Sequence, residues 1–213
     1  MYEVIASPFL DDSLVLRPGS QQAVKIGAQR YRELLGAAAV PDAPCPPWLV
    51  DAAHARWGLD LGGRPLAGTV MVREPSPYGY GRASYELNLG CNYDCEHCYL
   101  GLKQFKGMAW DDRERVLHIM QDAGVLWVQL TGGEPTIDPL FNEVYMLAWD
   151  LGMMITVLSN GSRLHNPRIL EVLVAPPVPD HVERVRRDGG VLRRADSAPG
   201  CVPAVHQGPG RGA

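Results

Sequence analysis

The sequence predicts an α/β protein in which residues 82–173 alternate strands and helices after a small α+β region at residues 1–75. Two observations predict the alternation. Short apolar runs of strand length end at glycines or turn residues, and longer runs with helical spacing lie between them. Strands that are separated by helices pair in parallel through right-handed crossovers. Residues 82–173 are therefore expected to form the first half of an α/β sheet or barrel.

The elements of this middle region follow from local signals. The expected strands are Ser84–Leu89, Val125–Leu130 and Met153–Leu158, and the expected helices run from Asp111 or Asp112 to Asp122, from Asp138-Pro139 to Leu151 and from Asn166-Pro167 to about Leu173. Proline is tolerated in the first turn of a helix, and glycine commonly follows the last turn. Val125–Leu130 is almost unbroken in its apolar character, which is typical of a strand buried on both faces.

The regions before and after residues 82–173 do not show this regular alternation of strands and helices. Before the middle region, short strands are expected at Tyr2–Ser7, Ser13–Arg17 and Gln22–Ile26, and helices at Ala28–Leu35 and Trp48–Trp57, joined by a proline-rich linker. After it, residues 174–213 are rich in proline, glycine and arginine and show little periodicity. Prolines where the next strand should lie would remove its hydrogen-bond donors. This tail is expected to be disordered or aberrant, in a chain that is truncated or frameshifted.

Composition narrows the functional classes. The chain of 213 residues is 46% hydrophobic and 21% charged, with a net charge of −4, which is typical of a globular protein and offers no basic surface for nucleic acid. It has neither a long apolar run nor a signal peptide, so no membrane partner is expected and a cytoplasmic location is the default. An odd total of five cysteines argues against a disulfide framework.

Three of the five cysteines lie close together directly after an expected strand. Cys91, Cys95 and Cys98 are separated by three and then two residues. Three thiolates on one loop can bind three irons of a cubane cluster, which leaves the fourth iron open. A structural zinc site is the alternative, but it would need a fourth protein ligand. Cys45 and Cys201 lack neighbouring ligands and are interpreted as free thiols.

This spacing resembles the signature of the radical SAM superfamily, with His97 in the place where the family has an aromatic residue. Two further motifs strengthen the resemblance. Residues 131–135, Thr-Gly-Gly-Glu-Pro, follow the second strand, and residues 159–161, Ser-Asn-Gly, follow the third. Ligands of parallel α/β folds gather at this edge of the sheet. The resemblance implies the first half of a partial (β/α)6 barrel.

The resemblance also implies the cofactors, a [4Fe-4S] cluster on the three cysteines and S-adenosyl-L-methionine on its open iron. Gly132 and Gly133 would let the backbone approach the methionyl group, and the Glu134 carboxylate would accept hydrogen bonds from its ammonium group. His97 and Asn160 would line the pocket of the adenosyl part. Reductive cleavage would then abstract a hydrogen atom from a substrate, with an electron donor such as ferredoxin or flavodoxin as a partner.

The layout of residues 1–75 is similar to the winged-helix peptide-recognition region found ahead of radical SAM maturases of ribosomal peptides. Such regions bind a leader peptide as an added strand at a sheet edge, so a peptide substrate is expected. A family-specific extension is the alternative for this region. For the whole chain, the alternative to an enzyme is a non-catalytic Fe–S or zinc-binding fragment that retains only the cofactor-binding edge.

Overall fold

The computed structural model describes residues 2–96, 98, 100 and 106–174 of the chain. The expectations for residues 175–213 therefore lie outside the described residues. Two compact units divide the described chain, the first ending at Gly81 and the second running from Arg82 to Val174. Each is described by itself below.

The first unit is an α+β region built on a four-stranded sheet. Its elements are β1 (Val4–Phe9), β2 (Asp12–Leu16), β3 (Ala23–Ile26), α1 (Ala28–Ala38), α2 (Pro47–Trp57) and β4 (Val70–Val72). The strand order is β3-β2-β1-β4, antiparallel except for the parallel pair of β1 and β4. Strand β4 is absent from the sequence prediction because three residues are too few to show a strand period.

Apolar side chains from these strands and helices form the core of the first unit. Cys45 belongs to this core and is a free cysteine. Burial raises the pKa of its thiol above the usual value. A buried, protonated thiol behaves as a small apolar side chain, which agrees with the interpretation of Cys45 as a thiol without a chemical role.

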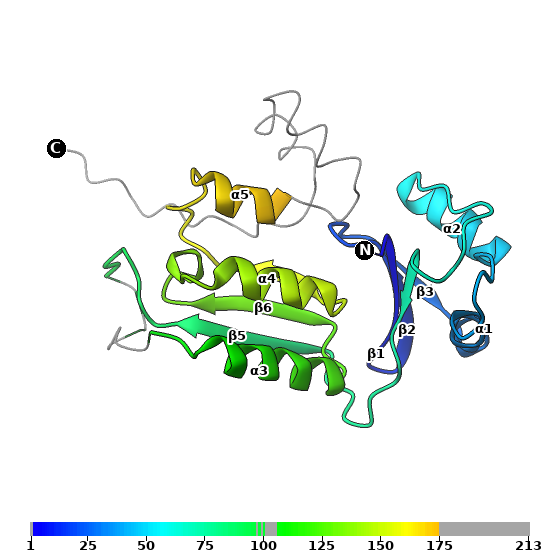
Figure 1. The fold of residues 1–213 in the computed structure, drawn as a ribbon, viewed down its shortest axis with the longest axis horizontal. Coiled ribbons are helices and arrows are strands. Elements are labelled where there is room, and N and C mark those ends of the chain that lie inside the picture. The colour runs from blue at the N-terminus through cyan, green and yellow to red at the C-terminus, as the bar shows by residue number, and fades with distance from the viewer. Residues whose placement is uncertain (1, 97, 99, 101–105, 175–213) are drawn as a thin grey trace. The chain divides into compact units, whose positions relative to one another are not determined.

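The second unit confirms the predicted alternation of strands and helices. Its elements are β5 (Arg82–Asn88), α3 (Trp110–Asp122), β6 (Trp127–Gly132), the 3-10 turn η1 (Pro135–Ile137), α4 (Phe141–Asp150), β7 (Met154–Val157) and α5 (Pro167–Val174). The sheet order is β5-β6-β7, and both pairings are parallel. Figure 1 shows β5 and β6 side by side with their arrowheads at the same end. The carboxyl ends of the strands therefore share one edge.

One face of this sheet packs against the helices. Val128 and Leu130 of β6 are buried with Leu117 of α3 and Phe141 of α4 in one apolar core. The alternate residues of β6, among them Gln129, are only partly buried. The prediction that this strand is buried on both faces is therefore wrong for its second face. Side chains alternate across a strand, and the described helices cover one side.

The backbones of β5 and β6 come into close contact at their carboxyl ends. Asn88 lies opposite Gly132 in the parallel register. Beyond this pair, the Gly133 N–H donates to the Asn88 carbonyl over 2.9 Å, and the Glu134 N–H donates to the Gly90 carbonyl over 2.8 Å. The chain after β6 is thus hydrogen-bonded to the first residues of the loop that carries the cysteines.

This contact explains both glycines. A Cβ atom would lie 2.0 Å from the Asn88 carbonyl oxygen if added at Gly132, and 2.1 Å from the Gly90 carbonyl oxygen if added at Gly133. Gly132 also has a φ of 129°, which side-chain-bearing residues rarely adopt. A side chain at Gly132 would displace the end of β5, and one at Gly133 would displace the start of the cysteine loop.

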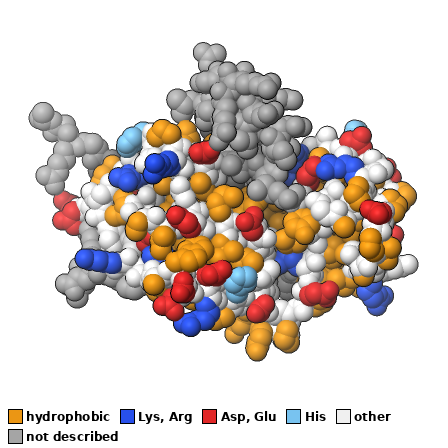
Figure 2. All heavy atoms as spheres, in the orientation of Figure 1, with side chains coloured by type: hydrophobic (Ala, Val, Ile, Leu, Met, Phe, Trp, Pro, Cys, Tyr) orange, Lys and Arg blue, Asp and Glu red, His pale blue; other side chains and the backbone are white. Residues whose placement is uncertain are grey.

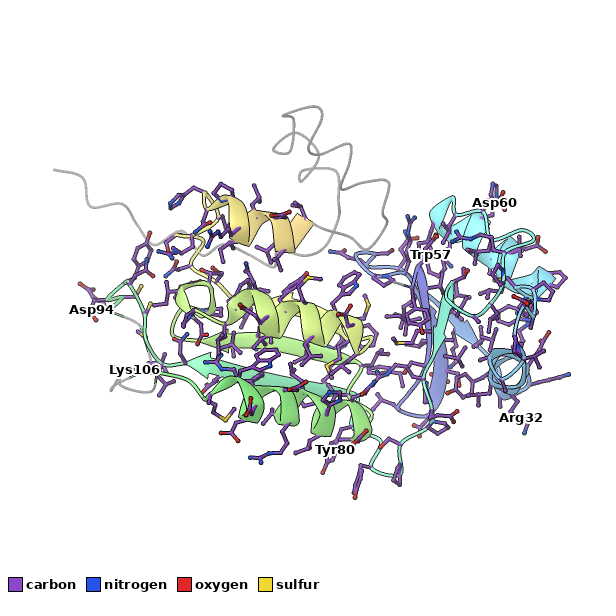
Figure 3. All side chains as sticks on the ribbon, viewed as in Figure 1. Arg32, Trp57, Asp60, Tyr80, Asp94 and Lys106 are labelled. Carbon is purple, nitrogen blue, oxygen red and sulfur yellow. The ribbon has the colours of Figure 1, made fainter. Side chains whose placement is uncertain are left out.

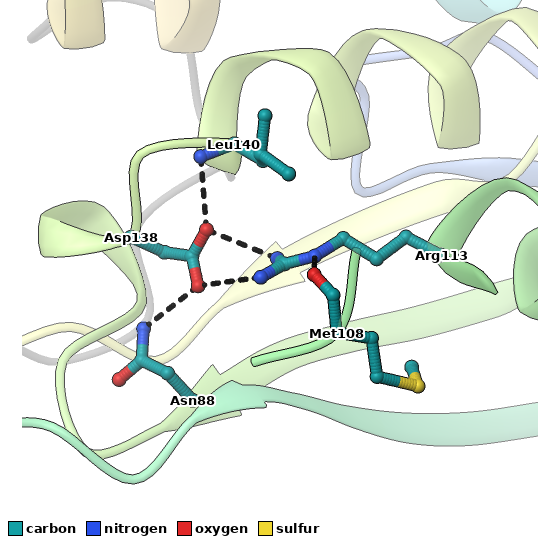
Figure 4. Close-up of polar contacts among 5 residues, drawn as sticks. All are labelled: Asn88, Met108, Arg113, Asp138 and Leu140. Atoms are coloured by element: carbon teal, nitrogen blue, oxygen red, sulfur yellow. Dashed lines mark hydrogen bonds and ion pairs between the residues drawn. The ribbon is translucent and has the colours of Figure 1, made fainter. Parts of the chain in front are cut away.

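A buried ion pair lies beneath the same edge (Figure 4). The Arg113 guanidinium donates to both carboxylate oxygens of Asp138 over 3.0 Å. Arg113 also donates to the Met108 carbonyl over 2.7 Å, while Asp138 accepts from the Asn88 amide over 3.2 Å and from the Leu140 N–H over 2.9 Å. One carboxylate thereby connects a residue before the cysteine loop with one after it.

The ion pair also explains where α4 begins. The sequence predicts its start at Asp138-Pro139, whereas the structure starts it at Phe141. The Asp138 carboxylate caps the Leu140 N–H and binds Arg113, so Asp138 stays in an extended conformation outside the helix.

A membrane-spanning helix needs both a certain length and an apolar character. No helix among the described residues is both long and apolar enough to cross a bilayer. On the face drawn in Figure 2, acidic and basic side chains are mixed over the described part.

We expect Gly133→Ala to lower the free energy of unfolding by about 1–3 kcal/mol, because its methyl group would overlap backbone atoms. Gly90→Ala is the matched control, since a Cβ there meets its nearest atoms at 3.6 and 3.8 Å, which is ordinary contact. Urea unfolding followed by tryptophan fluorescence measures both. Equal stability of the two variants would contradict the packing argument.

We expect Asp138→Asn to cost about 3–5 kcal/mol of stability, because it leaves the Arg113 charge buried without its partner. The control is Asp112→Asn, which removes the partner of Arg115 from an exposed pair on the same helix and should cost less than about 1 kcal/mol. If the two variants unfold at the same urea concentration, the buried pair does not stabilise this edge.

Candidate active site at the carboxyl edge of the sheet

The three predicted cluster ligands lie on the loop that follows β5. Cys91 and Cys98 are partly exposed, Cys95 is exposed, and all three are free thiols. The Cys98 N–H donates to the Cys95 carbonyl over 3.0 Å, which closes a turn between them. In Figure 3, Asp94 and Lys106 mark the two sides of this loop beyond the end of β5. His97 lies outside the described residues.

The donor set of this loop consists of three free thiols, which suit the iron corners of a cubane cluster. Within the described residues, which omit His97, no three His, Cys, Asp or Glu side chains converge as one metal ion would require. The thiolates of a cubane each bind a different iron, so their sulfurs need not converge on one centre. Three thiols on one accessible loop are suited to three such corners.

Glu134 is buried at the end of β6, and donors of the protein surround its carboxylate. One oxygen accepts from the Thr136 N–H over 3.0 Å, from the Thr136 hydroxyl and from the Ser159 hydroxyl over 2.8 Å. The other oxygen accepts from the Asn160 N–H over 2.6 Å. Glu134 therefore joins the end of β6 to the end of β7 and leaves more acceptor capacity on its second oxygen.

Asn160 follows β7 and reaches the cysteine loop. Its side-chain amide donates to the Cys91 sulfur over 3.8 Å and to the Asn92 side-chain oxygen over 3.0 Å. A second contact joins the same loops, because the Asn92 amide donates to the Ser162 hydroxyl over 2.8 Å. The residues after β7 thus hold the first cysteine.

The described site residues come together at one edge, as the strand order predicts. The Glu134 N–H donates to the carbonyl of Gly90, the residue before Cys91. Asn160 donates from its backbone to the Glu134 carboxylate and from its side chain to the Cys91 sulfur. Gly132 packs against the backbone of Asn88 at the end of β5, and Gly133 packs against the backbone of Gly90 in the cysteine loop, where a side chain would not fit. Their expected approach to a ligand, like the expected role of His97, stays a prediction.

Sequence reasoning missed the polar residues that support this edge. Arg113 is only 1% exposed, although arginine is rarely buried without a partner. A signal was present, because Arg113 stands four residues before the buried Leu117 and so shares its face of α3. Asn92 and Ser162 carried no comparable signal, since short polar residues are common in loops.

Comparison with known proteins agrees with these motifs. The model of the radical SAM superfamily matches residues 85–183. The chain is 35% identical over 72 residues to an S-adenosylmethionine-dependent nucleotide dehydratase of Thermoplasmatales archaeon (strain ISO4-H5), covering 34% of this chain and 26% of that protein. It is 33% identical over 126 residues to the antilisterial bacteriocin subtilosin biosynthesis protein AlbA of Bacillus subtilis (strain 168), covering 54% and 26%.

The chain thus spans about a quarter of the length of these two relatives. Among solved structures, it is similar to Streptococcus suis SuiB bound to precursor peptide SuiA, with a TM-score of 0.48 and 13% identity over 82% of this chain and 45% of that one. The matched residues 85–183 include the cysteine triplet, the Gly-Gly-Glu motif and the Asn-Gly turn. Residues 85–183 are therefore similar to the radical SAM superfamily over the part of the chain that carries these motifs.

Proposed function

We propose that the chain binds a [4Fe-4S] cluster and S-adenosyl-L-methionine and serves as the cofactor-binding part of a radical SAM enzyme. The observation that carries this proposal is the meeting of three motifs at one sheet edge. The Glu134 N–H binds Gly90 directly before the cysteines, and the Asn160 amide contacts the Cys91 sulfur. Residues from three successive strands thus surround the cysteine loop.

In this proposal Cys91, Cys95 and Cys98 would hold the cluster and leave one iron free for the methionyl group of S-adenosyl-L-methionine. When bound, these cofactors would supply one-electron reductive cleavage to methionine and a 5′-deoxyadenosyl radical, which takes a hydrogen atom from the substrate. The protein residues orient the cofactors and exclude water. The electron would come from a donor such as ferredoxin or flavodoxin.

Residues after β6 would hold the methionyl ammonium group. The carbonyls of Gly132 and Gly133 and the carboxylate of Glu134 are the proposed acceptors, and His97 would stand beside the adenine. Glu134 supports this role because its buried carboxylate is already fixed by Thr136, Ser159 and Asn160. A carboxylate that cannot rotate loses little entropy when it accepts one more charge-assisted hydrogen bond.

We further propose a peptide as the substrate. The similarity to AlbA, a protein of subtilosin biosynthesis, covers 54% of this chain, more than the 34% covered by the nucleotide dehydratase. In the first unit, β3 pairs with β2 on one side and stands at the end of the strand order. An edge strand of this kind can accept an extended peptide as an added strand.

Anaerobic reconstitution with iron and sulfide tests the cluster. We expect about four irons per chain in the parent and a large loss of bound iron in Cys95→Ala, because a cubane that loses one thiolate corner is poorly held. Cys45→Ala is the matched control, since that thiol is buried in the first unit, and it should retain the iron. Bound zinc without sulfide would contradict the proposal.

The reduced, reconstituted chain is then incubated with S-adenosyl-L-methionine, and 5′-deoxyadenosine is measured by chromatography. The proposed reaction predicts its formation, and a larger yield with a short peptide encoded beside the gene than with nucleotides. No 5′-deoxyadenosine would remove the enzymatic claim for this chain. Equal yields of 5′-deoxyadenosine with the peptide and with nucleotides would contradict only the proposal of a peptide substrate.

We expect Glu134→Gln to weaken binding of S-adenosyl-L-methionine by about tenfold or more, because a charge-assisted hydrogen bond is worth about 1.5–3 kcal/mol. Calorimetry on the reconstituted chain measures the dissociation constant. Glu143→Gln, the same change at an exposed position of α4, should leave it unchanged. If Glu134→Gln lowers thermal stability but not affinity, the carboxylate acts only as a link between β6 and β7.

A further inference from the structure

The side chain of Asn160 uses all its polar atoms within the protein. The amide nitrogen has two hydrogens, and it donates to the Cys91 sulfur over 3.8 Å and to the Asn92 oxygen over 3.0 Å. The amide oxygen accepts from the Ser162 N–H over 2.9 Å. Both hydrogens of the amide are therefore committed to the cysteine loop.

The contacts fix which end of the amide faces the sulfur. The oxygen and nitrogen of an Asn side chain must be assigned from their hydrogen-bond partners. A backbone N–H can only donate, so the atom that faces Ser162 must be the oxygen. The atom that faces Cys91 must then be the nitrogen, and its hydrogens point toward the sulfur.

The backbone of Asn160 is held as well. Its N–H donates to the buried carboxylate of Glu134 over 2.6 Å. The donor to Cys91 is thus fixed at both its main chain and its side chain. A second donor, the Tyr93 N–H, lies 3.4 Å from the same sulfur, so Cys91 receives more than one N–H.

Hydrogen bonds to cysteine sulfurs are among the factors that set the reduction potential of an Fe–S cluster. An N–H that points at a thiolate stabilises negative charge on the sulfur, and reduction adds negative charge to the cluster. We propose that Asn160 is a positioning residue that raises the cluster's reduction potential through its bond to the Cys91 sulfur. This rests on the proposed function, because it needs the cluster on Cys91.

This assignment differs from a contact with S-adenosyl-L-methionine. Both amide hydrogens are engaged, so the amide has no donor left for the cofactor and keeps only one further acceptor site on the oxygen that binds Ser162. Removal of the amide should therefore change the cluster and leave cofactor affinity nearly unchanged. The two roles predict opposite results for the same variant.

Two variants test the proposal in the reconstituted chain. Asn160→Asp keeps the oxygen that Ser162 binds but replaces the donor with a negatively charged acceptor. Asn160→Leu removes both polar atoms at similar size. The midpoint potential is measured by redox titration with electron paramagnetic resonance, and the affinity for S-adenosyl-L-methionine by calorimetry.

We expect the equilibrium constant for reduction to fall at least threefold in Asn160→Leu and further in Asn160→Asp, where a tenfold fall is about 59 mV for one electron. The dissociation constant of S-adenosyl-L-methionine should stay within about twofold, as expected if the amide contributes no bond to it. The matched control is Asn166→Asp, which can keep its bond to the Arg168 N–H at the start of α5. It should keep the parent's potential.

If both Asn160 variants keep the reduction potential of the parent, the proposal for Asn160 is overturned and the proposed function still stands. If they keep that potential but bind S-adenosyl-L-methionine more weakly, Asn160 is instead a contact of S-adenosyl-L-methionine. If Asn160→Leu does not fold, Asn160→Asp decides by itself. A parent chain that binds no cluster would overturn both this proposal and the proposed function. Cluster content is measured first, which separates the two failures.

Discussion

The contact between the backbones of β5 and β6 at their carboxyl ends is the constraint on which the candidate site depends. Gly133 and Glu134 donate to carbonyls of Asn88 and Gly90, so the chain after β6 lies directly against the start of the cysteine loop. No side chain fits between them. The fold itself therefore requires the two glycines of the Gly-Gly-Glu motif, whether or not a ligand is bound.

Polar contacts extend this constraint to either side. Below the edge, Arg113 and Asp138 form a buried pair that reaches both flanks of the cysteine loop. Above it, Glu134 fixes Asn160, and Asn160 reaches the Cys91 sulfur. The loop with the three cysteines is thus flanked on both sides by side chains that are themselves hydrogen-bonded, as expected where ligands must be held in one geometry.

The order of strands and helices in the second unit was predictable because apolar period and turn residues are local signals. The place of the cysteines beyond β5 followed from the same signals. Long-range pairings were not predictable. Asp138 was expected to open a helix, but it binds Arg113 and α4 starts later. Gln129 was expected in a doubly buried strand, but the strand has one buried face. Such outcomes depend on which distant residue lies opposite.

Asp138 is linked to both flanks of the cysteine loop, and this affects the free energy of ligand binding to the loop. Asp138 binds Asn88 directly and Met108 through Arg113, so protein contacts alone join the ends of the loop. Closing a flexible loop costs entropy, and that cost is met during folding when the ends are fixed beforehand. A ligand that binds to this loop would then meet flanks whose separation the protein has already fixed, so less of its binding free energy would be spent on joining them.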